Sequence, residues 1–245
     1  MTAHGYVVIA ALMLPAAALA TPAQAQMDRV PSIEGEVRPT GPLFSRQAAT
    51  VTGFLFAAAL LGDHQFREAS QEHRTSATNT MADVGNTFGE WQLIVPVLSA
   101  SYLAGEIAGN RAMKGTALRA VAAVALATGM SAGLKYSIGR TRPEAGGDNF
   151  RFRPFSGANS FPSGHTAAAF AIATVVADQT DDQWSDYLLY GAATMTAFAR
   201  VNDNRHWASD VLIGGLIGHL SGRWVSRRFG SLRVAPMGVT ASFEF

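Results

Sequence analysis

The sequence predicts an all-α protein: a compact bundle of about six helices with a short extended or β-hairpin C-terminal tail. Six apolar stretches rich in Ala, Leu, Val and Gly recur along the chain, with little of the apolar–polar alternation that is typical of strands. Polar segments such as 63–86 and 178–186 separate these stretches. The length of 245 residues suits one such bundle with a leader.

The composition excludes several classes of function. No cysteine is present, which removes disulfide frameworks, thiolate catalysis and cysteine-bound zinc. The formal net charge is +1, so the whole molecule has no bias toward nucleic acid, and any basic site has to be local. Charged residues make up 15% of the chain, which is low for a soluble protein. The mean hydropathy of +0.12 is nevertheless modest for a chain made mostly of membrane spans.

The N-terminal region has the pattern of a leader followed by a linker. An apolar run over 7–20 precedes a small-x-small cleavage pattern, which predicts a signal peptide over 1–25. An uncleaved anchor is the alternative, although the run is short for a bilayer span and contains Pro15. Residues 26–45 carry three prolines and two glycines and are expected to form an extended linker.

The helical domain is expected over 46–228. Its six apolar stretches are 47–62, 91–109, 116–138, 165–177, 187–201 and 211–224. A bilayer span needs about 20 apolar residues, and several stretches are shorter or contain a charge, such as Glu106 or Arg119. The many small residues suit close helix packing in a membrane and in a soluble bundle alike, so both arrangements stay open. The tail, 229–245, has Pro236 and Gly238 between two short runs, which predicts a strand or small hairpin.

The first chemical motif is a pair of cations at the end of the third stretch. Lys135 and Arg142 bracket this end, Gly139 helps the chain to turn, and Pro143 disfavours helix at Arg142. The two cations repel each other unless an anion lies between them. The alternative is a basic helix end that the helix dipole favours.

The second motif, Pro162-Ser163-Gly164-His165, is typical of a helix start. Ser163 is a suitable cap, and Gly164 allows another group to approach the backbone closely. The free N–H groups of a first helical turn bind anions, and His165 can reach an anion held there. The alternative is an ordinary cap followed by a partly buried histidine.

The third motif combines Arg200, His206 and Asp210. His206 and Asp210 stand at positions i and i+4, which face each other on a helix. A carboxylate there can hold one imidazole nitrogen and leave the other free to attack. The alternatives are that Asp210 only favours a helix N-terminus, or that the pair binds zinc together with His165. The three cations of the motifs would repel a divalent metal ion, so the residue types favour an anion.

Taken in order, the three motifs resemble the signature of the type 2 phosphatidic acid phosphatase and vanadium haloperoxidase superfamily, in its bacterial phosphatase branch. That signature reads K-x6-R-P, P-S-G-H and S-R-x5-H-x3-D on a helical bundle. The matching residues are Lys135, Arg142, Pro143, Pro162, Ser163, Gly164, His165, Arg200, His206 and Asp210. The chain departs from the signature at Ala199, where a serine is usual, and this would remove a hydrogen bond near the site.

The resemblance implies a role for each matching polar residue. His206 would be the nucleophile that becomes a phosphohistidine, Asp210 would orient it, and His165 would be the general acid and base. The residues expected to bind phosphate are Lys135, Arg142, Ser163, Gly164 and Arg200. No metal and no cofactor are required, because phosphoryl transfer depends mostly on positioning and charge stabilisation.

The expected activity is therefore that of a phosphoric monoester hydrolase acting on lipid phosphates or small phosphate esters. One alternative is a vanadate-dependent haloperoxidase, although such enzymes are generally larger. Another is a non-catalytic membrane or phosphate-binding protein of the same fold, which only Ala199 favours. The loop around Arg151 and Arg153 could meet a lipid headgroup or act as a packed lid. The protein is expected to be exported and periplasmic, either soluble or associated with the membrane; an integral inner-membrane protein is the alternative.

Overall fold

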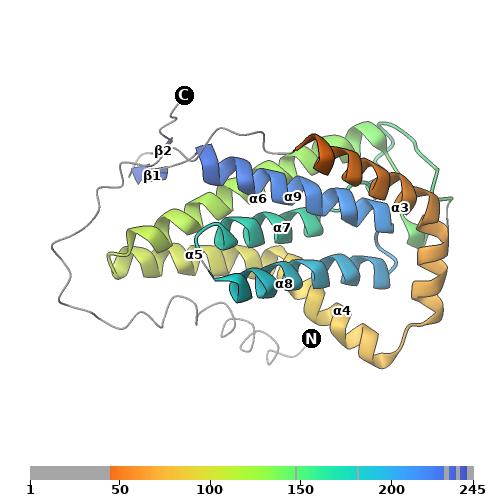
Figure 1. Cartoon of the computed structure of the whole chain (residues 1–245), viewed down its shortest axis with the longest axis horizontal. Coiled ribbons are helices and arrows are strands. Elements are labelled where there is room, and N and C mark those ends of the chain that lie inside the picture. Colours follow the sequence, from red (N-terminus) through yellow and green to blue (C-terminus); the bar gives the residue numbers. More distant parts are fainter. Residues whose placement is uncertain (1–44, 147, 181, 229–231, 236–237, 242–245) are drawn as a thin grey trace.

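The structure, a computed structural model, describes residues 45–146, 148–180, 182–228, 232–235 and 238–241 (Figure 1). The predicted signal peptide and nearly all of the linker lie outside these residues. The helices are α3 (Arg46–Glu72), α4 (Ser76–Gly89), α5 (Trp91–Ile107), α6 (Arg111–Ile138), the 3-10 turn η1 (Pro143–Ala145), α7 (Gly164–Ala177), α8 (Gln183–Asn202) and α9 (Ala208–Arg228). The all-α prediction is confirmed.

Helix α7 lies at the centre of the bundle, and α6, α8 and α9 pack around it (Figure 1). Its side chains are almost all small, so neighbouring backbones can come close. Gly214, Gly218 and Gly222 form a stripe along the facing side of α9. A Cβ atom at Gly218 would lie 2.2 Å from the carbonyl oxygen of Ala167, and one at Gly214 would lie 2.4 Å from that of Ser163. The stripe therefore brings the N-termini of α7 and α9 together, and these termini carry the second and third motifs.

The first predicted helix is longer than expected, and an additional helix follows it. The polar segment 63–86 was expected to connect helices, and that prediction is wrong: α3 continues to Glu72 and α4 begins at Ser76. Thr75 caps α4 in a capping box with Thr78. The buried positions of α4 are only Ala82, Gly85 and Gly89. Such a narrow stripe of small residues gives no apolar periodicity, which is why the sequence pattern concealed this helix.

The described part of the tail forms an antiparallel strand pair, in agreement with the hairpin prediction. Strand β1 (Leu232–Ala235) pairs with β2 (Gly238–Ala241), with Leu232 opposite Ala241. The pair lies at the end of the bundle where α9 finishes (Figure 1). The motif residues lie at the opposite end, where α7 and α9 begin.

The outer faces of the bundle expose many large apolar side chains. Phe54 on α3 is 74% exposed, Ile107 on α5 is 87% exposed, and Trp184 on α8 is 74% exposed. Of the described helices, α6 is long and apolar enough to cross a bilayer. So many exposed large apolar side chains are unusual for a soluble monomer and typical of a membrane or protein contact surface.

Candidate active site

A pocket of about 210 Å³ opens at the end of the bundle where the three motifs meet. Five of the predicted site residues line it: Lys135, Arg142, Gly164, His165 and His206. The rest of its lining comes from α5 and α6 through Trp91, Thr128, Ser131 and Ala132. Ser163, Arg200 and Asp210 are not among the lining residues, and each instead contacts groups beside the pocket.

The cations of the first motif are brought together by a turn at the end of α6. Gly139 caps α6 with φ +60°, and a Cβ atom there would collide with the carbonyl oxygen of Arg153, so only glycine suits the position. Lys135 Nζ donates to the carbonyl oxygen of Asn159 at 2.5 Å. The Nε atom of Arg142 is buried and hydrogen-bonds to none of the described residues. It is therefore available to a ligand.

The start of α7 is built as the second motif predicts. Ser163 is the N-cap: its Oγ accepts from the backbone N of Thr166 at 3.4 Å and hydrogen-bonds to the Thr166 hydroxyl at 2.9 Å. The Ser163 backbone N–H donates to the carbonyl oxygen of Asp210 at 3.0 Å, which ties α7 to α9. The Ser163 hydroxyl is thus engaged inside the helix cap, and Gly164 presents its backbone to the pocket.

His206 lines the pocket, and Asp210 lies next to it, outside the lining. His206 Nδ1 is 3.6 Å from Asp210 Oδ2, slightly longer than a hydrogen bond, and it has no other hydrogen-bond partner among the described residues. The Asp210 Oδ2 atom is fixed by the Ser160 hydroxyl at 2.5 Å and by the Trp207 backbone N–H at 3.0 Å. With Nδ1 facing the carboxylate, Nε2 is the nitrogen left free to react.

Burial and neighbouring cations keep both pocket histidines neutral. Burial lowers the pKa of His206 to about 4, although the adjacent Asp210 carboxylate opposes this shift. Burial also lowers the pKa of His165 to about 4, and the positive charge of Arg200 adds to the effect. At neutral pH the pocket therefore combines unprotonated imidazoles with the permanent cation of Arg142 and with Lys135, whose pKa burial lowers to about 8. This arrangement suits a negatively charged, electrophilic ligand.

The side chain of Arg200 is hydrogen-bonded to α4. Its Nη1 donates to Asn86 Oδ1 at 2.9 Å, and Asn86 Nδ2 donates to Asp203 Oδ2 at 2.6 Å. Its Nε is buried without a partner among the described residues. Ala199, the departure from the signature, is buried against α4, and its Cβ lies 3.1 Å from the Cβ position of Gly85. The hydroxyl of a serine at position 199 would therefore lie at the contact with α4. In this protein Asn86 of α4 provides the hydrogen bond to Arg200 from that side.

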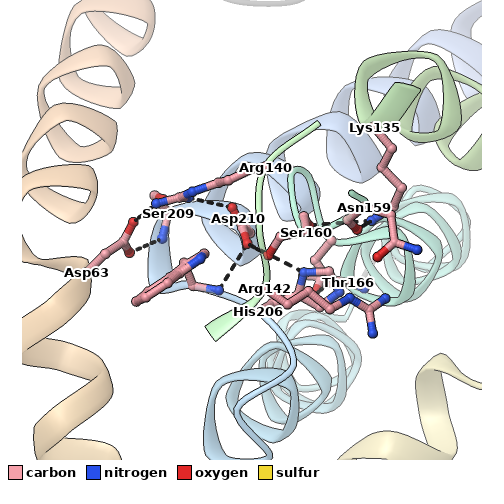
Figure 2. Close-up of polar contacts among 12 residues, drawn as sticks. Asp63, Lys135, Arg140, Arg142, Asn159, Ser160, Thr166, His206, Ser209 and Asp210 are labelled. Atoms are coloured by element: carbon pink, nitrogen blue, oxygen red, sulfur yellow. Dashed lines mark hydrogen bonds and ion pairs between the residues drawn. The ribbon is translucent and has the colours of Figure 1, made fainter. Parts of the chain in front are cut away.

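Several polar residues around the site were not predicted. Arg140 donates to both Asp210 and Asp63, and all three side chains are fully buried (Figure 2). Ser160 and Ser209 complete this set of contacts. The only sequence signals were a second arginine two residues before Arg142 and a lone acid at the end of the first apolar stretch. The zinc alternative gains no support, since the described residues contain no group of three or more His, Cys, Asp or Glu that could hold a metal ion.

Comparison with known proteins places this site in a family. The model of the PAP2 superfamily matches residues 116–233, which include all three motifs. A lipid A 1-phosphatase of Porphyromonas gingivalis is 42% identical over 108 residues, which are 42% of this chain and 22% of that protein. The chain thus aligns with about a fifth of that relative's length.

Two solved structures share the fold. Aquifex aeolicus LpxE superposes with a TM-score of 0.55 at 22% identity, covering 66% of this chain and 93% of that one. The first transmembrane PAP2 type phosphatidylglycerolphosphate phosphatase from Bacillus subtilis gives a TM-score of 0.56 at 19% identity, covering 72% and 92%. The family match and the shared fold agree with the resemblance of the motifs: residues 116–233, the part of the chain that carries all three motifs, match the PAP2 superfamily.

Proposed function

We propose that the protein is a phosphatase that hydrolyses a lipid phosphate monoester through a phosphohistidine at His206. The observation that carries this proposal is that two buried arginine nitrogens, Arg142 Nε and Arg200 Nε, hydrogen-bond to none of the described residues and lie near His206. Both belong to cations that can neutralise phosphoryl oxygens, and the His206 imidazole is held beside Asp210 with its Nε2 free. A site of this kind stabilises charge in a phosphoryl transfer without further reorganisation.

The reaction has two steps. His206 is the nucleophile in the first and the leaving group in the second, and His165 is the acid in the first and the base in the second. In the first, His206 Nε2 forms a bond to phosphorus while the bond from phosphorus to the ester oxygen breaks, and His165 gives a proton to the departing alcohol. In the second, a water molecule gives a proton to His165 and attacks phosphorus, and the phosphorus–nitrogen bond breaks. Inorganic phosphate leaves, and His206 returns to its neutral form. Asp210 stabilises the positive charge that His206 carries between the steps.

A lipid is the favoured substrate class because the pocket lining combines charged with apolar side chains. Lys135 and Arg142 are the charged residues, whereas Trp91 on α5 and Ala132 on α6 are apolar. The named relatives also act on lipid phosphates, one as a lipid A 1-phosphatase and the other as a phosphatidylglycerolphosphate phosphatase. An acyl chain lying along α5 and α6 would leave the phosphate among the cations.

We further propose that the protein is exported and bound to a membrane, with its pocket at the lipid surface. The exposed apolar side chains of α3, α5 and α8 and the apolar length of α6 support this location. A substrate that stays in the bilayer would then reach the pocket along the outside of the bundle, without entering water.

The test is a hydrolysis assay of the detergent-solubilised protein with phosphatidic acid, with and without vanadate. We expect release of inorganic phosphate, inhibition by vanadate, and no halide oxidation when peroxide is added. We expect His206→Ala to abolish release while vanadate still binds, because the cations remain. Halide oxidation by the vanadate-loaded protein would instead indicate a haloperoxidase. Binding of vanadate without any turnover of lipid or soluble esters would indicate a phosphate-binding protein.

A further inference from the structure

A fully buried arginine lies behind the pocket, outside the proposed phosphate-binding set. Arg140 Nη1 donates to Asp210 Oδ1 at 2.6 Å and to Ser209 Oγ at 2.7 Å. Its Nη2 donates to Asp63 Oδ2 at 2.7 Å and to the carbonyl oxygen of Asn149 at 2.7 Å, and its Nε donates to the same carbonyl at 2.9 Å. All five N–H donors of the guanidinium are thus engaged within the protein, and none is left for a substrate.

The surroundings of Arg140 fix its position. The ring centroid of Phe152 lies 5.5 Å from the guanidinium carbon, and that of Trp207 lies 5.3 Å from it. Asp63 also accepts from the backbone N–H and the hydroxyl of Ser209, at 2.9 and 2.6 Å, so α3 and α9 are joined through the same cluster (Figure 2). Asp210 is therefore held on one oxygen by Arg140, and its other oxygen is left on the His206 side.

The charges of this cluster balance only when His206 is positively charged. Asp63 and Asp210 carry two negative charges and Arg140 carries one positive charge, all in fully buried side chains. With His206 neutral, the cluster has a net charge of −1. A phosphorylated His206 with a cationic ring brings the sum to zero.

We propose that Arg140 and Asp63 are positioning residues for phosphoryl transfer: they aim the Asp210 carboxylate at His206, keep it ionised, and set the buried charge that the cationic His206 intermediate completes. This inference rests on the proposed function. Neither residue touches the substrate. Both residues affect the reaction through Asp210. Removal of Arg140 makes the buried cluster more negative, whereas removal of the Asp63 charge makes it less negative, so the two changes should shift the pH of proton uptake in opposite directions.

The pH dependence of the reaction reports the net charge of the buried cluster, because this charge determines the pH at which Asp210 or His206 takes up a proton. The charged and titratable groups that face His206 and Asp210 from the surrounding elements are Asp63, Lys135, Arg140, Arg142, His165 and Arg200. Removal of Arg140 leaves two carboxylates buried together, and such a pair takes up a proton at a higher pH. Whether the proton goes to Asp210 or to His206, the productive form, with a neutral imidazole and an ionised carboxylate, is lost.

The experiment compares the acid limb of kcat/KM for p-nitrophenyl phosphate in Arg140→Gln, Asp63→Asn and the double variant. We expect Arg140→Gln to move the acid limb up by about 1 to 3 pH units, the range for a charge within 4–6 Å. Asp63→Asn should not move it upward, but should lower kcat because the cationic intermediate is no longer balanced. The double variant restores the net charge of −1, so its acid limb should return to the wild-type position.

Two further variants separate this role from a structural one. Arg140→Lys keeps the charge and loses the two-armed contact, so it should retain the wild-type acid limb with a lower kcat. Arg223→Gln is the matched control, since it removes another arginine of an ion pair: Arg223 Nη1 lies 2.7 Å from Asp178 Oδ1. Arg223 is about 20 Å from Asp210 along α9, so the pH profile of this variant should be that of the wild type. A folded Arg140→Gln protein with the wild-type acid limb would overturn the proposal. So would a double variant no closer to the wild type than Arg140→Gln.

A titration of His206 in the absence of substrate tests this inference separately from the proposed function. The imidazole signals of ¹⁵N-histidine-labelled protein, assigned with His206→Asn, report proton uptake at His206 in the absence of substrate. Among the wild type and the variants, we expect the titration midpoints of His206 to follow the same order as the acid limbs of kcat/KM. If the wild type hydrolyses no phosphate ester, the proposed function fails while the charge coupling is still measured. If Arg140→Gln does not fold, Asp63→Asn decides the question, because removal of one buried negative charge should lower the titration midpoint of His206 below that of the wild type. An unchanged midpoint in Asp63→Asn would overturn the proposal.

Discussion

At the scale of single residues, the site combines cationic lysine and arginine side chains with histidines that burial keeps unprotonated. His206 has a pKa of about 4, so its free nitrogen retains its lone pair across the neutral range. His165 also has a pKa of about 4 and carries no proton to donate before substrate binds. A phosphate monoester with a second pKa near 6 can bring that proton when it binds as the monoanion. The bound phosphate then offsets the cations that disfavour protonation of His165.

This charge state predicts an acidic pH optimum. The lowered pKa of His206 means that it becomes protonated only as the pH falls through about 4, and activity is then lost on the acid side. On the basic side, activity declines above a pH of about 6, where the substrate loses the proton that it carries. A kcat/KM profile for a soluble phosphate monoester between pH 3 and 9 measures both limbs. An acid limb at the ordinary histidine pKa of about 6.5 would show that His206 is not held neutral as described.

At the scale of elements, α4 supplies a support for the site that the sequence pattern did not reveal. Its face toward α8 is formed by small residues, and its one polar contact with the site is made by Asn86, which bridges Arg200 and Asp203. The other helices were predictable because each places a broad apolar face in the core. The second and third motifs were predictable because capping and i,i+4 geometry are local. Arg140 and Asp63 were not, because 77 positions separate them and only the packing of α3 on α9 brings them together.

Removal of the Asn86 side chain tests the support that α4 gives to Arg200. We expect Asn86→Ala to lower kcat/KM by about 10- to 100-fold, since a hydrogen bond to a charged group contributes about 1.5–3 kcal/mol. Steady-state kinetics with the Arg200→Ala and double variants should show strong non-additivity, because Asn86 acts through Arg200. Asn79→Ala on the same helix, where Asn79 accepts from Asn202 at 3.3 Å, is the control. Equal losses in the two asparagine variants would mean that α4 only stabilises the fold.

At the scale of the whole molecule, the polar end and the apolar sides of the bundle suit a position at a membrane. The pocket and its cations lie at one end, and the exposed apolar side chains follow the outer helices. The modest mean hydropathy of +0.12 conceals this division, because it averages the polar connections with the apolar sides. For this reason the composition did not decide between a soluble bundle and a membrane protein, whereas the exposed apolar side chains favour a membrane.

The exposed apolar surface predicts how the protein partitions between fractions. We expect the expressed protein to sediment with membranes, to stay there through washes with high salt and alkaline carbonate, and to be released by detergent. Salt removes contacts that are only electrostatic, whereas burial of apolar surface in lipid resists it. Immunoblots of the fractions provide the measurement. Recovery in the soluble periplasmic fraction without detergent would contradict membrane binding.

The most direct test of the central claim is capture of a phosphoryl group on His206. His165→Ala is the suitable protein, and p-nitrophenyl phosphate is the suitable substrate, because nitrophenolate departs without a proton while the second step still requires a base. Mass spectrometry of peptides prepared at alkaline pH should find one phosphoryl group on the peptide that contains His206. That group should be absent from the His165→Ala/His206→Ala double variant. An unmodified His206 peptide under conditions of continuing turnover would contradict the account.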